Sequence, residues 1–377
     1  MDRPRQVLCA PNAFKGSLSA EEVAIAMALG VEDAGFSAQA LPLADGGDGT
    51  LDVLIAAAGD ASSISHHTVH GPLGEPASGR VGWLGDGRAV VEMADAAGLR
   101  LLRSEQLEPL LASSRGCGEL IVAALDGGAT EVIVGVGGSA SSDGGAGILQ
   151  ALGSALLDSA GREVGPGAAG LLELERIDCQ SLRRLDGRVL VAVDVRNPLL
   201  GPFGAAAVFG PQKGAGAAQV DVIEQALGRL AAMAERDCDA AGLADADGAG
   251  AAGGAGFGLL VAGAELLPGA SLVCDVAGLT PAFIAEFELV LTGEGRLDSQ
   301  TSFGKAPAEV AARAVAAGVT VAAVAGTVLD PLPAMFTTAV GLDSVAEPGA
   351  DLMRDAAALV RLAAAEAVRR VLGSGAQ

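Results

Sequence analysis

The sequence predicts an α/β protein of two domains, with parallel strands covered by helices on both faces. The chain has 377 residues, a length typical of two domains. Short apolar runs alternate with helical patterns at both ends of the chain. Between about 66 and 285 the pattern changes to strand candidates joined by glycine-rich connections of very unequal length.

The first domain begins with strand and helix in alternation. Residues 7–10 are a short apolar run, and Ser19 with Glu22 can cap a helix that continues to about Gly35. A second strand near 38–43 leads into the loop ADGGDGT and another helix. This order indicates a βαβα start.

The C-terminal segment of about ninety residues repeats the alternation. A buried strand is followed by the loop TGEGRLDSQTSFGKAP and a helix, and then by two more strands and a long helix rich in alanine and arginine. The expected elements are strand 288–291, helix 307–317, strand 320–325, strand 339–342 and helix 351–372.

The middle of the chain is interpreted as a second α/β domain inserted into the first. Its strand candidates are 79–83, 88–93, 132–136 and 189–193. Residues 1–65 and 286–377 would then form one discontinuous domain and 66–285 the inserted one, with the active site in the cleft between them. Two domains laid end to end remain the alternative.

Composition excludes several classes of partner. The 46 acidic against 24 basic residues give a net charge of −22, which argues against nucleic acid. Neither a signal peptide nor an apolar run of membrane-spanning length is present, so no membrane partner is expected. The five cysteines are odd in number and never CxxC-spaced, which indicates reduced thiols and a cytoplasmic protein.

Only three lysines occur, and each stands beside a glycine. They are Lys15 in PNAFKGS, Lys213 in GPQKGAG and Lys305 in SFGKAP. An ammonium group is a compact charge suited to a phosphate that bare backbone can approach. We expect Lys15 at the transferring phosphate and Lys213 or Lys305 at the outgoing one.

The string EVIVGVGGSASSDGGAG (131–147) is the strongest local signal. An apolar strand runs into glycines and serines and then into an apolar helix expected over 148–156. Glycine lets backbone N–H groups approach phosphate oxygens, serine adds donors, and the helix directs its positive end at the loop. The candidate phosphate-binding residues here are Gly137, Gly138, Ser139, Ser141 and Ser142.

Acidic residues follow several of the expected strands, where α/β proteins bind ligands. Asp194 is the expected base that accepts a hydroxyl proton, with Asp45 as second candidate. Glu294 and Asp298 are the expected Mg²⁺-side carboxylates. Arg296, or else Arg196, has the planar fork that binds a substrate carboxylate. With the lysines, this set indicates phosphoryl transfer.

Two other patterns carry less weight. GAGAAG (248–253) fits GxGxxG but does not follow a strand, so a tight turn near a ligand is expected instead of a dinucleotide site. His66, His67 and His70 lack the spacing of a zinc site and are expected on a surface strand.

Seven strings along nearly the whole chain resemble the bacterial glycerate kinase family. They are PNAFKGSLSA, LADGGDGT, EMADAAGL, GVGGSASSDGGAG, DVRNPLLGPFGAAAVFGPQKGA, GAGAAGG and TGEGRLDSQTSFGKAP. The resemblance implies ATP-dependent phosphorylation of D-glycerate, generally at the 2-hydroxyl group. It also implies a flavodoxin-like domain that carries a larger inserted α/β domain.

The chain departs from the family pattern at a few positions. Asn12 stands where the family usually has aspartate, and Asp48 where it has glutamate. Ser141 and Ser142 replace a Thr-Asn pair. Asn12 cannot act as a base. The open alternatives are a kinase for the 3-hydroxyl group or for another small hydroxy acid, and a non-enzymatic sensor of a phosphorylated acid.

Overall fold

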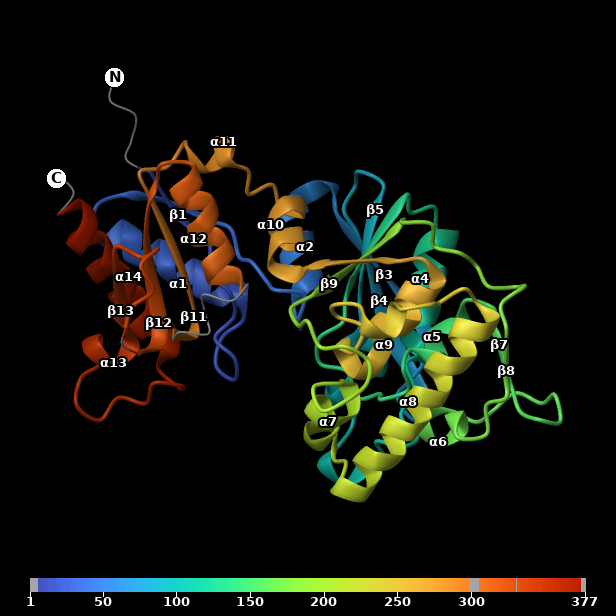
Figure 1. Cartoon of the computed structure of the whole chain (residues 1–377). Coiled ribbons are helices and arrows are strands. Elements are labelled where there is room, and N and C mark those ends of the chain that lie inside the picture. Colours follow the sequence, from blue (N-terminus) through green and yellow to red (C-terminus); the bar gives the residue numbers. More distant parts are fainter. Residues whose placement is uncertain (1–5, 298–304, 330, 374–377) are drawn as a thin grey trace. The chain divides into compact units, whose positions relative to one another are not determined.

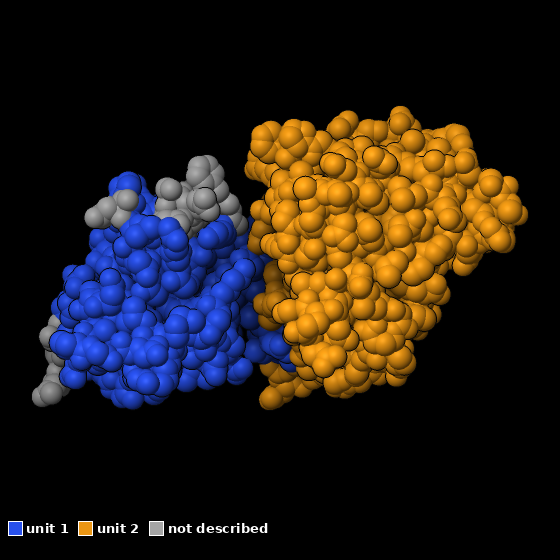
Figure 2. Space-filling model, turned by 90° about the horizontal axis from the view of Figure 1, so that it is seen from below, with its two compact units in different colours: residues 1–45, 52–57, 270–377 blue, residues 46–51, 58–269 orange. Residues whose placement is uncertain are grey.

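A computed structural model describes residues 6–297, 305–329 and 331–373. The chain forms two compact units, which Figures 1 and 2 show by element and by colour. Unit 1 contains residues 1–45, 52–57 and 270–377, and unit 2 contains residues 46–51 and 58–269. Both contain helices packed on a sheet with parallel strands, which confirms the predicted α/β class.

Unit 1 is built on a five-stranded parallel sheet. Its strands are β1 (Gln6–Cys9), β2 (Ser37–Ala40), β11 (Leu289–Leu297), β12 (Thr320–Val328) and β13 (Thr338–Gly341). Their spatial order is β13-β12-β11-β1-β2, and every neighbouring pair is parallel. Because β1 pairs with β11, one sheet joins the two ends of the chain.

Helices pack on the unit 1 sheet. Those that contact its strands are α1 (Ala20–Asp33), α12 (Ala306–Ala316), α13 (Leu342–Val345) and α14 (Ala356–Leu372), and α11 (Pro281–Ile284) contacts α12. Both α2 (Thr50–Ala58) and α10 (Gly269–Val276) have residues in both units. The capping box predicted at the start of α1 is confirmed, because Glu22 N donates to Ser19 Oγ and Ser19 N donates to Glu22 Oε2. α1 and α14 share one core with β1 and β11, and α12 packs on β11 and β12 outside that core.

Unit 2 is built on a six-stranded sheet. Its strands are β3 (Ser63–His70), β4 (Pro76–Trp83), β5 (Arg88–Glu92), β6 (Glu131–Gly135), β9 (Val189–Val193) and β10 (Glu265–Pro268). The order is β10-β9-β6-β5-β4-β3, with β10, β9, β6 and β5 parallel and β4 antiparallel to both of its neighbours. A separate antiparallel pair is formed by β7 (Ala155–Leu157) and β8 (Arg176–Asp178).

Seven α-helices of the described chain lie wholly in unit 2. They are α3 (Met93–Ala97), α4 (Arg115–Asp126), α5 (Ala146–Ala151), α6 (Gly167–Leu171), α7 (Ala205–Phe209), α8 (Ala217–Asp237) and α9 (Ala251–Ala262). Fully buried Val91, Val134 and Val191 place β5, β6 and β9 at the centre of the core. The three histidines lie on the edge strand β3, as predicted, and no metal-binding group of His, Cys, Asp or Glu occurs among the described residues.

Two elements end at residues other than those predicted. β11 continues to Leu297 instead of stopping at Leu291, so Glu294 and Arg296 lie on a strand and not in a loop. The glycines of this segment allow it, because a Cβ on Gly293 would lie 1.9 Å from Val324 O of the paired strand β12. The helix expected over 148–156 is the shorter α5, and the chain then turns into β7.

The expectation of five free thiols is wrong for two of them. Cys179, after β8, and Cys238, at the end of α8, form a disulfide, whereas Cys9, Cys117 and Cys274 are free and buried. The sequence separation of 59 residues hides this pairing, which depends on the packing of α8 against β8. No helix in the described part of the chain is both long and apolar enough to span a membrane.

Candidate active site

The C-terminal edge of the unit 2 sheet carries the predicted phosphate-binding loop, residues 136–145, between β6 and α5. Main-chain hydrogen bonds fix this loop to the end of α3. Leu99 N donates to Gly138 O at 2.8 Å, and Ala140 N donates to Ala97 O at 2.7 Å. The end of α3 and the residues just after it therefore hold the 136–145 loop in place at this edge of the sheet.

A second glycine-rich loop, residues 46–50, lies against the first within unit 2. Gly137 N donates to Gly46 O at 3.3 Å. A Cβ placed on Gly138 would lie 2.2 Å from Asp48 Oδ1, so the Asp48 carboxylate occupies the space beside this glycine. Two strings that lie about ninety residues apart in the sequence therefore meet at one edge of the sheet.

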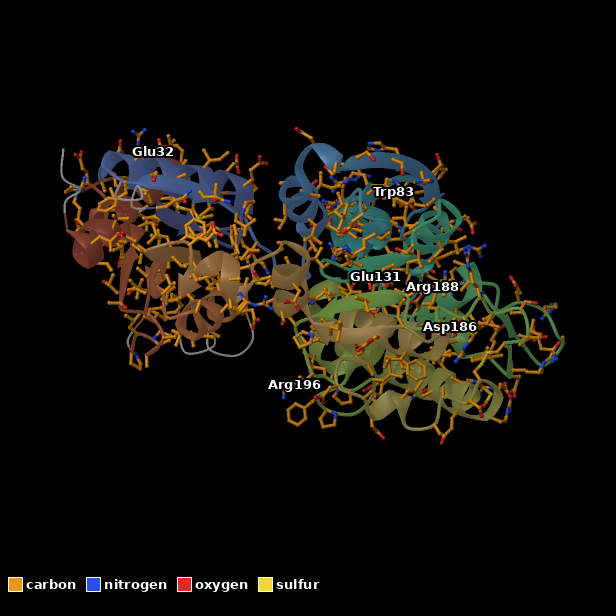
Figure 3. The ribbon with its side chains drawn as sticks, turned by 90° about the horizontal axis from the view of Figure 1, so that it is seen from above. Glu32, Trp83, Glu131, Asp186, Arg188 and Arg196 are labelled. Carbon is orange, nitrogen blue, oxygen red and sulfur yellow. A yellow bond between two sulfur atoms is a disulfide. The ribbon has the colours of Figure 1, made fainter. Side chains whose placement is uncertain are left out.

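The end of β9 belongs to the same edge. A Cβ on Gly46 would lie 2.7 Å from the Ala192 Cβ, and the exposed Asp194 follows two residues later. Arg196 is also exposed, and Figure 3 shows it apart from Arg188, which precedes β9. The predicted base and one predicted arginine thus follow a strand that touches the 46–50 loop.

Lys213, which was predicted at the outgoing phosphate, is buried against the 136–145 loop. It ends the short 3₁₀ helix Pro211–Lys213 and is only 2% exposed. Its Nζ donates to Ser139 Oγ at 2.9 Å and to Ser141 O at 2.5 Å. Burial lowers the pKa of Lys213 to about 7, while the charge of Asp143 acts in the opposite direction.

Asp143 has a structural role in the same loop. Its fully buried carboxylate accepts hydrogen bonds from Ser114 N at 2.8 Å, from Ser114 Oγ at 2.9 Å and from Gly147 N at 3.2 Å. These bonds join the start of α5 to the start of α4. Because they occupy the carboxylate inside the unit, Asp143 is not available to a ligand.

The GAGAAG string forms a tight turn inside α9, where residues 252–254 leave the helical conformation. Gly253 has a φ of +76°, and a Cβ on it would lie 2.1 Å from Ser141 O and 2.7 Å from Lys213 Nζ. The predicted backbone-tight turn therefore packs directly under the phosphate-binding loop.

Replacing Gly253 by alanine is expected to lower the free energy of unfolding by more than the same change at Gly242. Gly242 has a nearly identical φ of +75° but no atom within 4 Å of its Cβ position. Both variants carry the backbone strain of about 1–2 kcal/mol, and Gly253→Ala adds an overpacking cost of about 1–3 kcal/mol. Urea denaturation measures both, and equal losses would contradict the tight contact.

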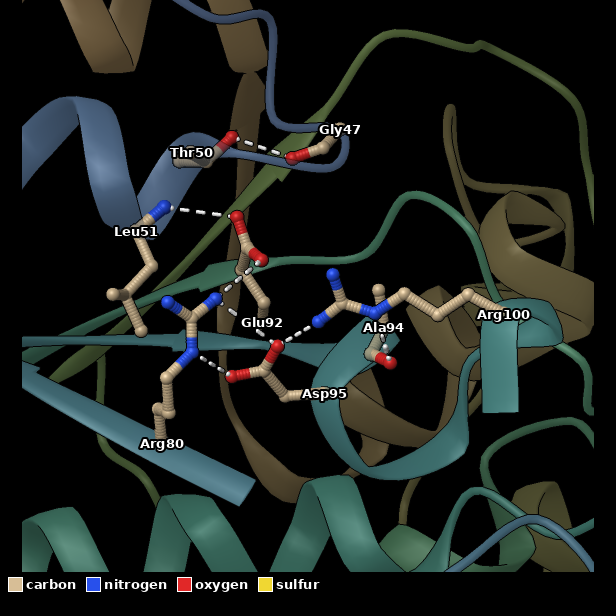
Figure 4. Close-up of polar contacts among 8 residues, drawn as sticks. All are labelled: Gly47, Thr50, Leu51, Arg80, Glu92, Ala94, Asp95 and Arg100. Atoms are coloured by element: carbon tan, nitrogen blue, oxygen red, sulfur yellow. Dashed lines mark hydrogen bonds and ion pairs between the residues drawn. The ribbon is translucent and has the colours of Figure 1, made fainter. Parts of the chain in front are cut away.

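Two buried carboxylates support the loops from below (Figure 4). Glu92 is 1% exposed and Asp95 is 4% exposed. Glu92 Oε1 accepts a hydrogen bond from Leu51 N at 2.9 Å, directly after the 46–50 loop. Arg80 bridges the pair, with Nε 2.8 Å from Asp95 Oδ2 and Nη2 3.9 Å from Glu92 Oε2, and Arg100 also binds Asp95.

Replacing Glu92 by glutamine is expected to lower the free energy of unfolding by about 1–3 kcal/mol, because a buried charge facing Arg80 is lost. The matched control is Glu119→Gln at the half-buried pair with His70, where a loss below about 1 kcal/mol is expected. Denaturant titration of both variants measures the difference. A loss at Glu92 no larger than at Glu119 would show that the network does not hold the loop.

The remaining predicted residues lie in unit 1. Asn12 N donates to Gly293 O at 2.8 Å, so the PNAFKGS loop lies along β11, and Lys15 is exposed. Asn12 Nδ2 donates to Asp45 Oδ2 at 3.2 Å. The position where the family usually has a carboxylate therefore serves as a donor to the second candidate base.

Lys305 and Glu294 form an ion pair within unit 1. Lys305 Nζ lies 3.3 Å from Glu294 Oε2, and the Glu294 side chain is largely buried. Arg296, two residues further along β11, is exposed. Asp298 lies outside the described residues.

Within unit 2 the structure thus brings together the two glycine loops, the end of β9 and Lys213. Within unit 1 it brings Lys15 and Asp45 near β11, which carries Glu294. Glu92 and Asp95 were not predicted as site residues. A usable signal existed, because EMAD places two carboxylates three residues apart at the end of an apolar strand.

The chain is similar to known proteins over almost its whole length. The family model described as "Glycerate kinase family" matches residues 7–372. A glycerate kinase of Bacillus subtilis (strain 168) is 44% identical over 95% of this chain and 98% of its own length. A glycerate 2-kinase of Escherichia coli (strain K12) is 43% identical over 90% of this chain and 89% of its own. A crystal structure from Salmonella typhimurium LT2, assigned as glycerate kinase 2, shares 39% identity, covers 98% of both chains and superposes with a TM-score of 0.85.

Proposed function

Because the chain belongs to the glycerate kinase family, we propose that it transfers the γ-phosphoryl group of ATP to D-glycerate. The product is 2-phosphoglycerate, released together with ADP. The Escherichia coli relative is a glycerate 2-kinase, which supports the 2-hydroxyl group as acceptor. One structural observation supports the proposal above all. The 46–50 and 136–145 loops meet at the C-terminal edge of the parallel strands of unit 2, which is where α/β proteins bind ligands.

The phosphate groups of ATP are proposed to bind the 136–145 loop. The Ser141 and Ser142 hydroxyls are buried without a hydrogen-bond partner among the described residues, and a hydroxyl group can donate to a phosphate oxygen. Lys15 and Lys305 supply positive charge, which such a site needs in a chain of net charge −22.

The chemical step is a displacement at the γ-phosphorus. The glycerate hydroxyl oxygen forms the new P–O bond as the bond to the β,γ-bridging oxygen breaks, and ADP leaves. Asp194 is proposed to accept the hydroxyl proton, with Asp45 as the second candidate. Arg296 or Arg196 is proposed to bind the glycerate carboxylate, since a guanidinium binds it through two parallel hydrogen bonds.

Mg²⁺ is the metal that this chemistry implies. Carboxylate oxygens are the donors it prefers, and Glu294 with Asp298 would hold it. The donor type fits, although Lys305 competes for one Glu294 oxygen at 3.3 Å. The ion would neutralise charge on the phosphate oxygens when bound.

A coupled assay of ADP release with D-glycerate tests the proposed function. Glycerate-dependent ADP release is expected, and phosphorus NMR of the product separates 2-phosphoglycerate from 3-phosphoglycerate. Turnover with a different hydroxy acid, but not with glycerate, would reassign the substrate. Ligand protection against thermal unfolding without any ADP release would instead indicate a sensor.

A further inference from the structure

Lys213 lies where three segments of unit 2 converge. It follows Pro211 and Gln212 in a short 3₁₀ helix, and its side chain is among the largest of the fully buried ones in the described chain. The turn at Gly253 leaves no space for a side chain next to Nζ, because a Cβ there would lie 2.7 Å away. The amine group therefore has a fixed position beneath the 136–145 loop.

The contacts of Lys213 go to the loop itself. Nζ donates to a hydroxyl, Ser139 Oγ at 2.9 Å, and to a main-chain carbonyl, Ser141 O at 2.5 Å. The hydroxyls of Ser141 and Ser142 make no hydrogen bond with any described residue. Of the loop's three serine side chains, Ser139 is the one whose hydroxyl has a hydrogen-bond partner among the described residues, and that partner is Lys213.

Asp143 is the charged group that acts on this lysine within the described chain. Its carboxylate is fully buried and bonded to Ser114 and to the start of α5, so the two groups form no close ion pair. Burial therefore lowers the pKa of Lys213 from the ordinary 10.5 to about 7, so both the ammonium and the neutral amine are accessible near neutral pH. A neutral amine still has two N–H donors for its two acceptors.

We propose that Lys213 is a positioning residue, which sets the shape of the 136–145 loop for nucleotide phosphate through Ser139 and Ser141 and does not touch the nucleotide. The inference rests on the proposed function and deepens it. Lys213 is 2% exposed and its amine already donates to Ser139 Oγ and Ser141 O, and the turn at Gly253 lies against it. Direct phosphate binding, the role predicted for Lys213 from the sequence, is the alternative to this indirect one.

Lys213→Met keeps most of the side-chain length and removes the donors. We expect a loss of about 10²-fold in kcat/KM for ATP, the size of effect that a displacement of about 1 Å produces, with little change in the KM for glycerate. Arg229→Met is the matched control, because Arg229 also bonds a main-chain carbonyl of unit 2, that of Leu174. That variant should leave kcat/KM for ATP unchanged. Equal behaviour of the two variants would overturn the proposal.

A double-mutant cycle separates the indirect role from two independent ones. If Lys213 acts through Ser139, the losses of Lys213→Met and Ser139→Ala in ADP affinity should not multiply in the double variant. Losses that multiply fully would show that Lys213 does not act through this serine. The affinity is measured by calorimetry with ADP and Mg²⁺, so it needs no glycerate turnover.

Proton uptake on ADP binding is a further test of Lys213. If the lysine only stabilised the fold, its replacement would not change this uptake. A phosphate near the loop favours the ammonium form, so ADP binding at pH 8 is expected to take up part of a proton in the wild type. Calorimetry in two buffers of different ionisation enthalpy measures it, and Lys213→Met should lose it. Absence of uptake in the wild type would overturn the proposal even if the variant did not fold.

The failure of this inference can be told apart from that of the proposed function. ADP binding without glycerate-dependent ADP release would overturn the kinase proposal alone. The role of Lys213 would still be tested, because the ADP affinities of the wild type and Lys213→Met can be compared without turnover. If the wild type bound no ADP at all, both would be overturned.

Discussion

Replacing Asp194 by asparagine should lower kcat by about 10²–10⁴-fold, because the amide cannot accept the glycerate hydroxyl proton. Asparagine has nearly the same shape, and Asp194 is exposed at the end of β9, so the folded structure should persist. Steady-state kinetics with D-glycerate measure the loss, and thermal unfolding verifies the fold.

Asp221→Asn is the matched control for this experiment. Asp221 is also an exposed aspartate of unit 2, but it lies on α8 and not at the C-terminal edge of the sheet. Its kcat should equal that of the wild type. Near-full kcat in a folded Asp194→Asn protein would remove Asp194 as the base and direct the same test to Asp45.

Lys15→Ala is expected to reduce kcat by about 10²–10³-fold, as happens when one group that stabilises a developing negative charge is removed. Lys15 is exposed, so its loss should change the melting temperature little. Kinetics and thermal unfolding of the same preparation give both numbers.

The control for charge alone is Arg354→Ala, which removes an exposed basic group of unit 1 paired with Asp355. It should leave kcat intact, because an exposed basic group already paired with a carboxylate contributes little. A Lys15→Ala protein that melted much earlier but kept its kcat would make Lys15 a structural residue.

Local patterns were sufficient to predict most of the strands, and the helices α1, α12 and α14. The Ser19–Glu22 capping box and the apolar runs of β6 and β9 were recognisable, because a helix cap and a buried strand depend on residues close together in the sequence. The extension of β11 through Leu297 could not be read in this way. Its glycines usually indicate a loop, and only the partner strand β12 shows that they serve a close approach of two backbones.

The parts of the candidate site that are formed by continuous strings of the sequence were predictable. The glycine strings around Asp48 and Gly138 were identified from the sequence alone, and their meeting depends on sheet order. The burial of Lys213 was not predictable, because a lysine beside glycine is usually solvated. Its partners Ser139 and Ser141 are more than seventy residues away in the sequence.

The pairing of β1 with β11 has a consequence for synthesis of the protein. β1 emerges from the ribosome with β2, yet its other neighbour begins at Leu289 and follows only after all of unit 2. Until then the edge of a nascent sheet stays open, which is a known route to aggregation during translation. Unit 2 has its complete set of strands first and can fold while the N-terminal strands wait. Chaperone demand and yield in cells should therefore respond most strongly to changes that slow translation before residue 289.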